Sequence, residues 1–556
     1  MSVPTPLVLV LTSASLCFLN VLVFPDIFPD TKLTTLFVSV TGVLLVVWGI
    51  WSVGIYPTFY HPLRHLPRPK FGAIPFIGYP RISFRTPRAA DAMLEMITHT
   101  PNDGLIQFPG LLNSTYLLPT DPAALADILV HKSYDFEKPT DIRKFLRIIL
   151  GDGLILVEGD EHKFQRKHLS PAFSFRHIKE LYPIFWSKAT DLCGRLAAEI
   201  YENPEPSTEL KTRHREGVVE VNHWATKVTM DIIGLAGLGR DFNTLYSSDD
   251  ELVASYEEIL EPTVQKALYF TANLLFSPDL INKLPWKLNQ RLKATMGTLR
   301  GACRQLIQER KETKLSDQDG KVDILSLLIK SNNFADDMLV DQLLTFLAAG
   351  HETTSSSLTW ATYLLAKHPE IQEKLREEIR TNLPSPSAAA NPDFDLGGML
   401  ETLPILHGVC NETLRLYPPV PTTVRVAVRD SMIGNEHIPA GTKIFLSPWG
   451  INRSPKLWGE SASEFVPDRW IDEETGKPNN HGGVKSNYAT LTFLHGPRSC
   501  IGEKFARSEL KALMAVFAGT FRLNMADPTE VPIPAGAITT KPKNGMRLKL
   551  QILEGW

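Results

Sequence analysis

The residue with the clearest chemical potential is a cysteine near the end of the chain. The ten residues that end at Gly502 are F-L-H-G-P-R-S-C-I-G, with Cys500 at the eighth position. Gly496 and Gly502 allow the backbone to turn tightly and to approach a flat cofactor. A helix predicted over residues 503–510 would direct its positive end at the sulfur and lower the pKa of the thiol. Arg498 could bind an anionic group, so the pattern predicts a thiolate that binds iron rather than a cysteine that only packs in a loop.

A second pattern places an acid beside an alcohol within a predicted helix. The letters A-G-H-E-T-T lie in an apolar, periodic segment over residues 337–366, with Glu352 and Thr353 adjacent. An acid next to an alcohol is what a proton relay requires. The hydroxyl of Thr353 can bond to the helix backbone and open a local groove, and the small Ala349 and Gly350 leave one face without bulk. The alternative is an ordinary helix with a solvated glutamate.

A third pattern pairs opposite charges on one helix face. Glu412 and Arg415 are three positions apart on a predicted helix over residues 406–416, which the run Y-P-P-V-P ends. The stretch F-V-P-D-R-W, which contains Arg469, follows later. An isolated E-x-x-R pattern is common, and as an exposed ion pair it would contribute under about 1 kcal/mol.

These patterns occur in the order in which the cytochrome P450 family carries them, and the chain resembles that family over roughly residues 55–550. The cysteine stretch is similar to the family's haem-ligand signature, F-x-x-G-x-R-x-C-x-G. The resemblance makes Cys500 the axial ligand of the iron of haem b. It assigns cofactor contacts to the other positions of the signature, which are Phe493, Gly496, Arg498 and Gly502.

The resemblance also assigns roles to the other two patterns. Glu352 and Thr353 take the catalytic acid and alcohol positions of the family's oxygen-activation motif. Glu412, Arg415 and Arg469 take the positions of a buried structural triad, which serves folding and support of the haem loop.

Three more residues match positions that bind the haem propionates in the family. The stretch G-D-E-H-K-F-Q-R-K resembles its W-x-x-x-R helix, with Arg166 as the arginine and His162 in place of the tryptophan. Both side chains can donate a hydrogen bond to a propionate. Arg425 matches another propionate-binding arginine. Further departures are Arg68, where many members have glycine between two prolines, and Asn452, where many have histidine.

The resemblance implies a mainly α fold with a smaller β region, and a monooxygenase that inserts one oxygen atom from dioxygen into a lipophilic substrate. Electrons would come from NADPH through NADPH–cytochrome P450 reductase, sometimes with cytochrome b5. The residues at the motif positions are most similar to those of fungal microsomal members. Such members often oxidise terpenoid, alkaloid or polyketide intermediates of secondary metabolism. Two alternatives stay open: a haem-thiolate isomerase or dehydratase that does not use dioxygen, and a haem-binding sensor or carrier without catalysis.

The N-terminus is predicted to anchor the chain in a membrane. Residues 7–24 and 33–56 carry no charge, and the second segment is long enough to cross a bilayer. The first could be a second span, a re-entrant piece or a signal peptide. A run of basic residues precedes the first acid after the anchor, Asp91; its members are Arg64, Arg68, Lys70, Arg81, Arg85 and Arg88. By the positive-inside rule the catalytic part faces the cytosol, which implies the endoplasmic reticulum membrane.

This organisation divides the chain into a membrane anchor over residues 1–56, a proline-rich hinge over 57–70 and a haem-thiolate domain over 71–556. Short strands and a helix are expected over 71–114, mostly helix up to Pro384, and strands and irregular structure from Val424 onward. The letters G-L-A-G-L-G at 234–239 follow a helical run, so they are interpreted as a helix end and not as a nucleotide-binding loop. Candidate pocket linings are residues 149–156, 270–276, 422–424 and 537–539.

Composition excludes several other classes. The 556 residues are 43% hydrophobic with a net charge of -3, so nothing indicates nucleic-acid binding. The five cysteines form no C-x-x-C pair, which argues against a disulfide framework or a structural zinc site. A basic face for an electron donor is predicted from five residues, which are Lys163, Lys167, Lys504, Arg507 and Lys511.

Overall fold

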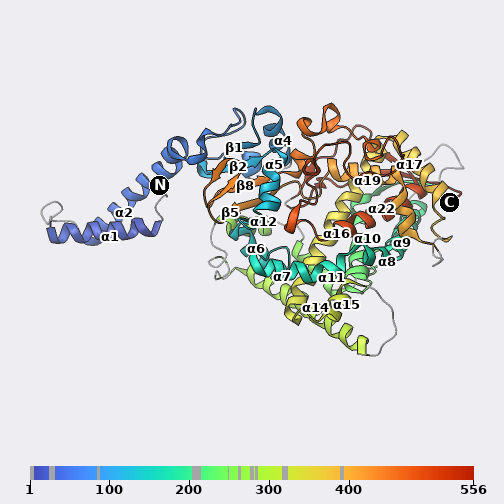
Figure 1. Ribbon diagram of the computed structural model, residues 1–556. Helices are drawn as coiled ribbons and strands as arrows, with labels where there is room; N and C mark the ends of the chain where they lie inside the picture. Colours follow the sequence, from blue (N-terminus) through green and yellow to red (C-terminus); the bar gives the residue numbers. More distant parts are fainter. Residues whose placement is uncertain are drawn as a thin grey trace.

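The computed structural model describes residues 6–23, 32–83, 88–202, 215–247, 250–260, 264–275, 281, 283, 286–315, 323–388, 394–536 and 538–556. A helical body and a sheet-rich part lie side by side, and two N-terminal helices extend away from the sheet-rich part (Figure 1). Three residues named in the sequence analysis, Arg85, Phe276 and Ala537, lie outside the described residues.

Helices dominate the described chain, as the sequence predicted. Those before residue 250 are α1 (Pro6–Val23), α2 (Leu33–Gly49), α3 (Pro80–Ser83), α4 (Ala89–His99), α5 (Pro122–Ala126), α6 (Thr140–Leu150), α7 (Gly159–Leu169), α8 (Phe175–Glu180), α9 (Tyr182–Glu202) and α10 (Val221–Ile232). Those after it are α11 (Glu251–Leu260), α12 (Val264–Leu275), α14 (Lys287–Leu315), α15 (Ile324–Ser331), α16 (Asp336–Lys367), α17 (Pro369–Asn382), α18 (Leu396–Thr402), α19 (Pro404–Leu416), α20 (Pro448–Ile451), α21 (Pro455–Trp458) and α22 (Glu503–Thr520).

Within the described residues, four small sheets complete the fold. The largest has the order β1-β2-β8-β5-β3, and a three-stranded sheet has the order β4-β12-β9. The pairs β6-β7 and β10-β11 are antiparallel hairpins. The strands are β1 (Leu105–Pro109), β2 (Thr115–Pro119), β3 (Phe136–Glu137), β4 (Glu216–Glu220), β5 (Thr423–Ala427), β6 (Ser431–Ile433), β7 (Glu436–Ile438), β8 (Lys443–Leu446), β9 (Phe521–Met525), β10 (Pro534–Ala535), β11 (Lys541–Pro542) and β12 (Arg547–Ile552).

The interior has two main hydrophobic clusters. The larger lies among α9, α10, α16 and α22, and the other packs against the five-stranded sheet. α16 runs through the helical body (Figure 1). Asp336 and Asp337 in its first turn and Lys367 in its last turn complement the helix dipole. Pro369 then begins the next helix, so the predicted helix over 337–366 is confirmed.

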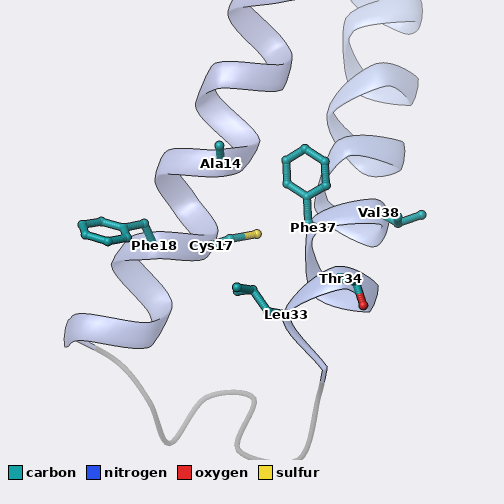
Figure 2. Close-up of a pocket in the computed structure, with 7 residues that line it drawn as sticks. All are labelled: Ala14, Cys17, Phe18, Leu33, Thr34, Phe37 and Val38. Carbon is teal, nitrogen blue, oxygen red and sulfur yellow. The ribbon is translucent and has the colours of Figure 1, made fainter.

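Helices α1 and α2 pack against each other outside the body. Seven residues line an apolar hollow of about 510 Å³ between them, which are Ala14, Cys17, Phe18, Leu33, Thr34, Phe37 and Val38 (Figure 2). α2 continues as a π-helix from Ile50 to Tyr60, so one uninterrupted apolar helix spans Leu33–Tyr60. By length and composition it alone among the described helices could cross a bilayer.

The proline-rich segment after this helix is packed against the domain. Leu63 and Leu66 are buried in the cluster under the five-stranded sheet. The backbone N–H of Gln107 donates to the carbonyl of Pro67 (2.9 Å), and Arg68 bonds to the Gln107 side chain. These contacts hold much of the predicted hinge on the domain surface.

The segment up to Pro384 is mostly helical, as predicted. Its described residues also contain three short strands, β2, β3 and β4. β4 pairs with β12, more than 300 residues later in the chain, and such a long-range partner cannot be inferred from local pattern. By contrast, the stretch 234–239 is a helix end as predicted, because Gly239 closes a final helical turn with φ +73°.

Candidate functional site

Tight turns hold Cys500 just before α22. The N–H of Cys500 donates to the carbonyl of Phe493 (2.8 Å), and Gly496 has φ +75°. A Cβ at Gly496 would lie 2.1 Å from the carbonyl oxygen of Leu129, so only glycine fits. Gly502 caps α22, which begins at Glu503 as predicted. The loop therefore fixes the position of the sulfur.

The electrostatics of this thiol differ from the expectation. A backbone hydrogen bond from Gly502, at the start of α22, favours the thiolate, and so do the charges of Arg166 and Arg507. Burial outweighs them, and with the opposing charge of Glu503 it raises the pKa of Cys500 to about 11. Direct coordination to a metal ion deprotonates a thiol outright, so the loop depends on a bound metal to hold a thiolate. Protein atoms surround and desolvate the sulfur, although the residue as a whole retains accessible surface.

A buried cluster of cations lies beside the loop. Arg498 is enclosed over the ring of Tyr134, donates to the carbonyls of Ser133 and Phe136, and forms an ion pair with Glu158. Its Nε has no hydrogen-bond partner among the described residues. The further members are Lys138 and Arg425.

Burial and the repulsion between neighbouring cations lower the pKa values of the basic groups in this cluster. Burial, Arg425 and Arg498 lower the pKa of Lys138 to about 7, although Glu158 opposes the shift. Burial and Arg498 lower the pKa of Arg425 to about 10. Three basic groups thus face one acid, Glu158, whose side chain is 4% exposed.

The two residues predicted on α7 lie in different places. His162 is buried beside the cluster, with Nδ1 3.1 Å from the hydroxyl of Tyr134. Burial, with Arg498 and Lys138, lowers the pKa of His162 to about 4, so its ring is neutral at physiological pH. Arg166 instead donates to the carbonyl of Ser499 (2.6 Å) and braces the cysteine loop.

These residues suit haem b. Haem b offers an iron that a thiolate can ligate and two propionate carboxylates. Cys500 supplies a thiol on a residue with accessible surface. Two residues before it, Arg498 belongs to a cluster with an excess of two basic groups and an unpartnered buried N–H. The sequence missed Lys138, Glu158 and Tyr134, because no spacing pattern distinguishes them from surface residues.

The predicted acid on α16 is held by the end of the chain. Oε1 of Glu352 lies 3.5 Å from Nζ of Lys541, and Oε2 accepts a hydrogen bond from Thr539 (3.3 Å). Between these two residues, the carbonyl of Thr540 accepts from Ser356 and from Trp360 (2.9 Å), both on α16. Thr540 therefore positions both partners of Glu352. No sequence pattern identified Lys541 as one of them.

The neighbouring residues of the motif follow the prediction only in part. The hydroxyl of Thr353 donates to the carbonyl of Ala349 (2.8 Å), the backbone bond that was expected. The absence of a side chain at Gly350 serves helix packing, because a Cβ there would lie 2.7 Å from the side chain of Ile233. The described contacts thus give Gly350 a packing role in place of the open face predicted for it.

Glu412, Arg415 and Arg469 meet in the interior. Arg415 donates from Nε and Nη2 to the two carboxylate oxygens of Glu412 (2.8 and 2.7 Å), and neither side chain is exposed. Arg469 adds a bond to Glu412 at 3.0 Å, and Trp470 adds one at 2.9 Å.

Asn452 connects this triad to the segment that leads into the cysteine loop. Arg415 donates to the carbonyl of Asn452 (2.7 Å). The Asn452 amide donates to Thr492 (2.8 Å), and its oxygen accepts from the N–H of Leu491 (2.7 Å). The departure from histidine at this position therefore preserves a link between the triad and the loop.

The predicted basic face is smaller than expected. Lys504 and Lys167 are exposed. Lys511 is buried and bonds to Glu401 (2.6 Å), which removes it from the face. Arg507 bonds to Glu503 and Asn411, and Lys163 pairs with Asp160.

Comparison with known proteins agrees with this geometry. The family model "Cytochrome P450" matches residues 111–548. Cytochrome P450 monooxygenase sphH of Aspergillus fumigatus is 41% identical over 95% of this chain and 95% of its own length. Cytochrome P450 monooxygenase ptmK of Penicillium ochrochloron is 36% identical over 92% and 98%, and cytochrome P450 monooxygenase buaD of Petromyces alliaceus is 34% identical over 94% of each. With the cysteine loop, the cation cluster and the buried triad in place, these matches show that the chain belongs to the cytochrome P450 family.

Proposed function

We propose that this cytochrome P450 is a membrane-anchored haem-thiolate monooxygenase that inserts one oxygen atom from dioxygen into a lipophilic substrate of fungal secondary metabolism. One observation carries the proposal: Cys500, a residue with accessible surface, follows by two positions Arg498, which belongs to a buried cluster with an excess of two basic groups. The relatives' names, all of them monooxygenases, support the reaction type.

Several residues of the chain would bind the haem. When bound, haem b supplies the iron at which dioxygen is reduced and activated. Cys500 would ligate that iron, and the N–H of Gly502 bonds to its sulfur. Arg498, Arg425 and Lys138 would hold the propionates, with His162 beside them.

Glu352 and Thr353 would move protons on α16. Thr539 and Lys541 orient the carboxylate of Glu352, which takes up and releases the proton at its oxygens. The hydroxyl of Thr353 holds a proton one residue further along the helix. A positioned relay of this kind contributes about 10²–10⁴-fold to the rate of a proton-transfer step.

Electrons would come from NADPH through NADPH–cytochrome P450 reductase, with cytochrome b5 as an auxiliary donor. The helix Leu33–Tyr60 supports a membrane location, and we place the enzyme in the endoplasmic reticulum membrane with its catalytic domain in the cytosol. A terpenoid, alkaloid or polyketide intermediate is the proposed substrate class. Phe493, Gly496 and Gly502 complete the proposed cofactor contacts.

The test combines the full-length enzyme, a fungal reductase, NADPH and ¹⁸O₂ with a panel of lipophilic metabolites. We expect a substrate that shifts the haem spectrum to be converted to a product with one ¹⁸O atom, at the expense of NADPH. Conversion without dioxygen or NADPH would replace this proposal with the isomerase or dehydratase alternative. Binding without any conversion would favour a sensor or carrier.

The relay is tested by Thr353→Ala, with Thr362→Ala as the matched control on the same helix. Thr362 also bonds back to the helix (2.9 Å to the carbonyl of Thr359) but lies outside the motif. We expect Thr353→Ala to keep its carbon monoxide spectrum and NADPH consumption while losing product to hydrogen peroxide. Equal product per NADPH in both variants would refute the relay.

A further inference from the structure

Two strained loop tips lie against the end of the apolar N-terminal helix. Phe76, Leu112 and Asn113 all have positive φ, at 65°, 53° and 55°. This conformation is unfavourable for large side chains, and it persists only where surrounding contacts enforce it. The loops hold each other, because the N–H of Leu112 donates to the carbonyl of Phe76 (2.7 Å).

The strained backbone turns apolar side chains outward. Phe76 is 57% exposed and Leu112 is 58% exposed. Ile74 and Leu111, in the same two loops, are exposed as well. The strained backbone costs free energy, and it exposes a group of apolar side chains. Such a group indicates a surface that contacts another apolar phase. We name Ile74, Phe76, Leu111 and Leu112 the loop-tip patch.

One asparagine joins this patch to the membrane helix. The side-chain oxygen of Asn113 accepts from the N–H of Phe76 (3.1 Å), and its amide donates to the carbonyl of Val53 (2.8 Å). Val53 lies four residues before Pro57 in the π-helical part of the Leu33–Tyr60 helix.

The length of the helix sets the depth of the patch. A helix of 28 residues is about 40 Å long, whereas the hydrocarbon core of a bilayer is about 30 Å thick. Trp51, Tyr56 and Tyr60 cluster near its end, as is typical of the interface between lipid and water. Asn113 contacts the helix within this aromatic zone. In Figure 1 the helix leads directly into the sheet-rich part that carries these loops.

We propose that the loop-tip patch enters the lipid surface and that Asn113 latches the membrane helix to the catalytic domain, which fixes the orientation of the domain on the membrane. This inference rests on the proposed membrane anchoring. The occupant of the patch is the bilayer itself, because the patch is continuous with a helix whose composition suits lipid.

Lipid contact is tested with the full-length, haem-loaded protein in phosphatidylcholine nanodiscs that contain brominated acyl chains. A fluorescent amino acid is placed in turn at Leu112, at Val43 on α2 and at Phe394, an exposed apolar residue just before α18. We expect the bromine atoms to quench the probe severalfold at Leu112 and Val43, and not at Phe394. Quenching at Val43 without quenching at Leu112 would refute the patch and leave the anchor intact. An unquenched probe at Val43 would refute the anchor itself.

The latch is tested with Asn113→Asp, which retains an acceptor for the N–H of Phe76 but cannot donate to Val53. Spin labels at Val43 and Val428, in a Cys17→Ser background, report the distance between helix and domain. We expect a narrow distance distribution in the parent and one at least twice as wide in Asn113→Asp, with the carbon monoxide spectrum unchanged. A broad distribution in the parent, or equally narrow distributions in both, would overturn the latch.

Discussion

Cys500 is the only cysteine of the chain that is both exposed and held at the start of a helix. Its replacement by serine should abolish the red-shifted Soret band of the reduced carbon monoxide complex, because an alcohol does not replace a thiolate ligand. Cys410→Ser is the control, since Cys410 is buried in α19 and burial raises the pKa of its thiol to about 12. Loss of the band in the control alone would contradict the assignment.

Lys541 shows how a residue with no motif of its own can act on the predicted relay. Its ammonium group is 3.5 Å from Glu352, and an ion pair of about 1 kcal/mol corresponds to about a fivefold change in rate. Lys541→Gln should therefore lower product formed per NADPH by a few-fold. The decrease should disappear in a Glu352→Gln background, because the partner charge is already absent. Additive losses in the double variant would show that Lys541 acts elsewhere.

The residues that sequence pattern could identify are those with a fixed local spacing. Cys500 and the pair Glu412 and Arg415 lie within single motifs, and the structure forms their predicted local geometry. Lys138 and Glu158 contribute to the cation cluster through tertiary contacts, which leave no local signature. For the same reason, the burial of Lys511 against Glu401 could not be foreseen from a basic helix face.

At the scale of elements, the buried triad connects α19 to the segment that carries Arg469. Arg415→Ala would leave the carboxylate of Glu412 without its bidentate partner in the interior, at a cost of about 3–5 kcal/mol. We expect a corresponding fall in the free energy of unfolding, measured with urea, together with weaker haem retention. Lys374→Ala, which removes an exposed ion pair to Asp468, should change stability by less than about 1 kcal/mol. Similar losses in the two variants would contradict a special role for the triad.

A buried acid links α22 to α16. Glu509 is 1% exposed beside Thr354, and burial raises the pKa of its carboxyl well above the usual value. The folded state therefore keeps a proton that the unfolded chain releases above about pH 4.5. This contribution to stability is complete at lower pH and is lost as pH rises, by up to about 1.4 kcal/mol per unit until the folded pKa is reached.

Glu509→Gln should remove that part of the pH dependence. The free energy of unfolding of the parent should fall relative to the variant as pH increases from 5 to 8, measured by urea unfolding at each pH. Other titrating groups contribute equally to both proteins and cancel in the difference. Parallel curves for the two proteins would mean that the carboxyl titrates alike in the folded and unfolded states.

Helices with strong periodicity and clear ends were predictable, whereas strands that depend on distant partners were not. α16 and α22 match the expected segments because their stop and start signals, Pro369 and Gly502, are local. β4 forms through β12 at the other end of the sequence. The close packing of Gly350 could not be predicted either, because the side chain that it contacts, Ile233, comes from another element.

At the scale of the whole molecule, the exposed lysines Lys167 and Lys504 define what is left of the predicted donor surface. Attraction of an acidic reductase by exposed charges weakens as salt shortens the Debye length to about 8 Å at physiological ionic strength. Reversing both lysines to glutamate should slow reduction of the haem at low salt and flatten its salt dependence, measured by stopped-flow spectroscopy. Substrate binding should not change. Kinetics identical to the parent at every salt concentration would exclude this surface.

The orientation of the molecule in the membrane leads to the last prediction. The basic residues after the helix, among them Arg64 and Lys70, predict a cytosolic catalytic domain by the positive-inside rule, so we expect protease added to intact microsomes to digest it. Asn113, in the sequence N-S-T, should carry no glycan, because glycosylation occurs on the lumenal side. The structure adds an independent reason, since the Asn113 amide is already bonded to the carbonyl of Val53. A protected domain with a glycan on Asn113 would overturn both the topology and the latch, whereas a digested, unglycosylated domain agrees with both.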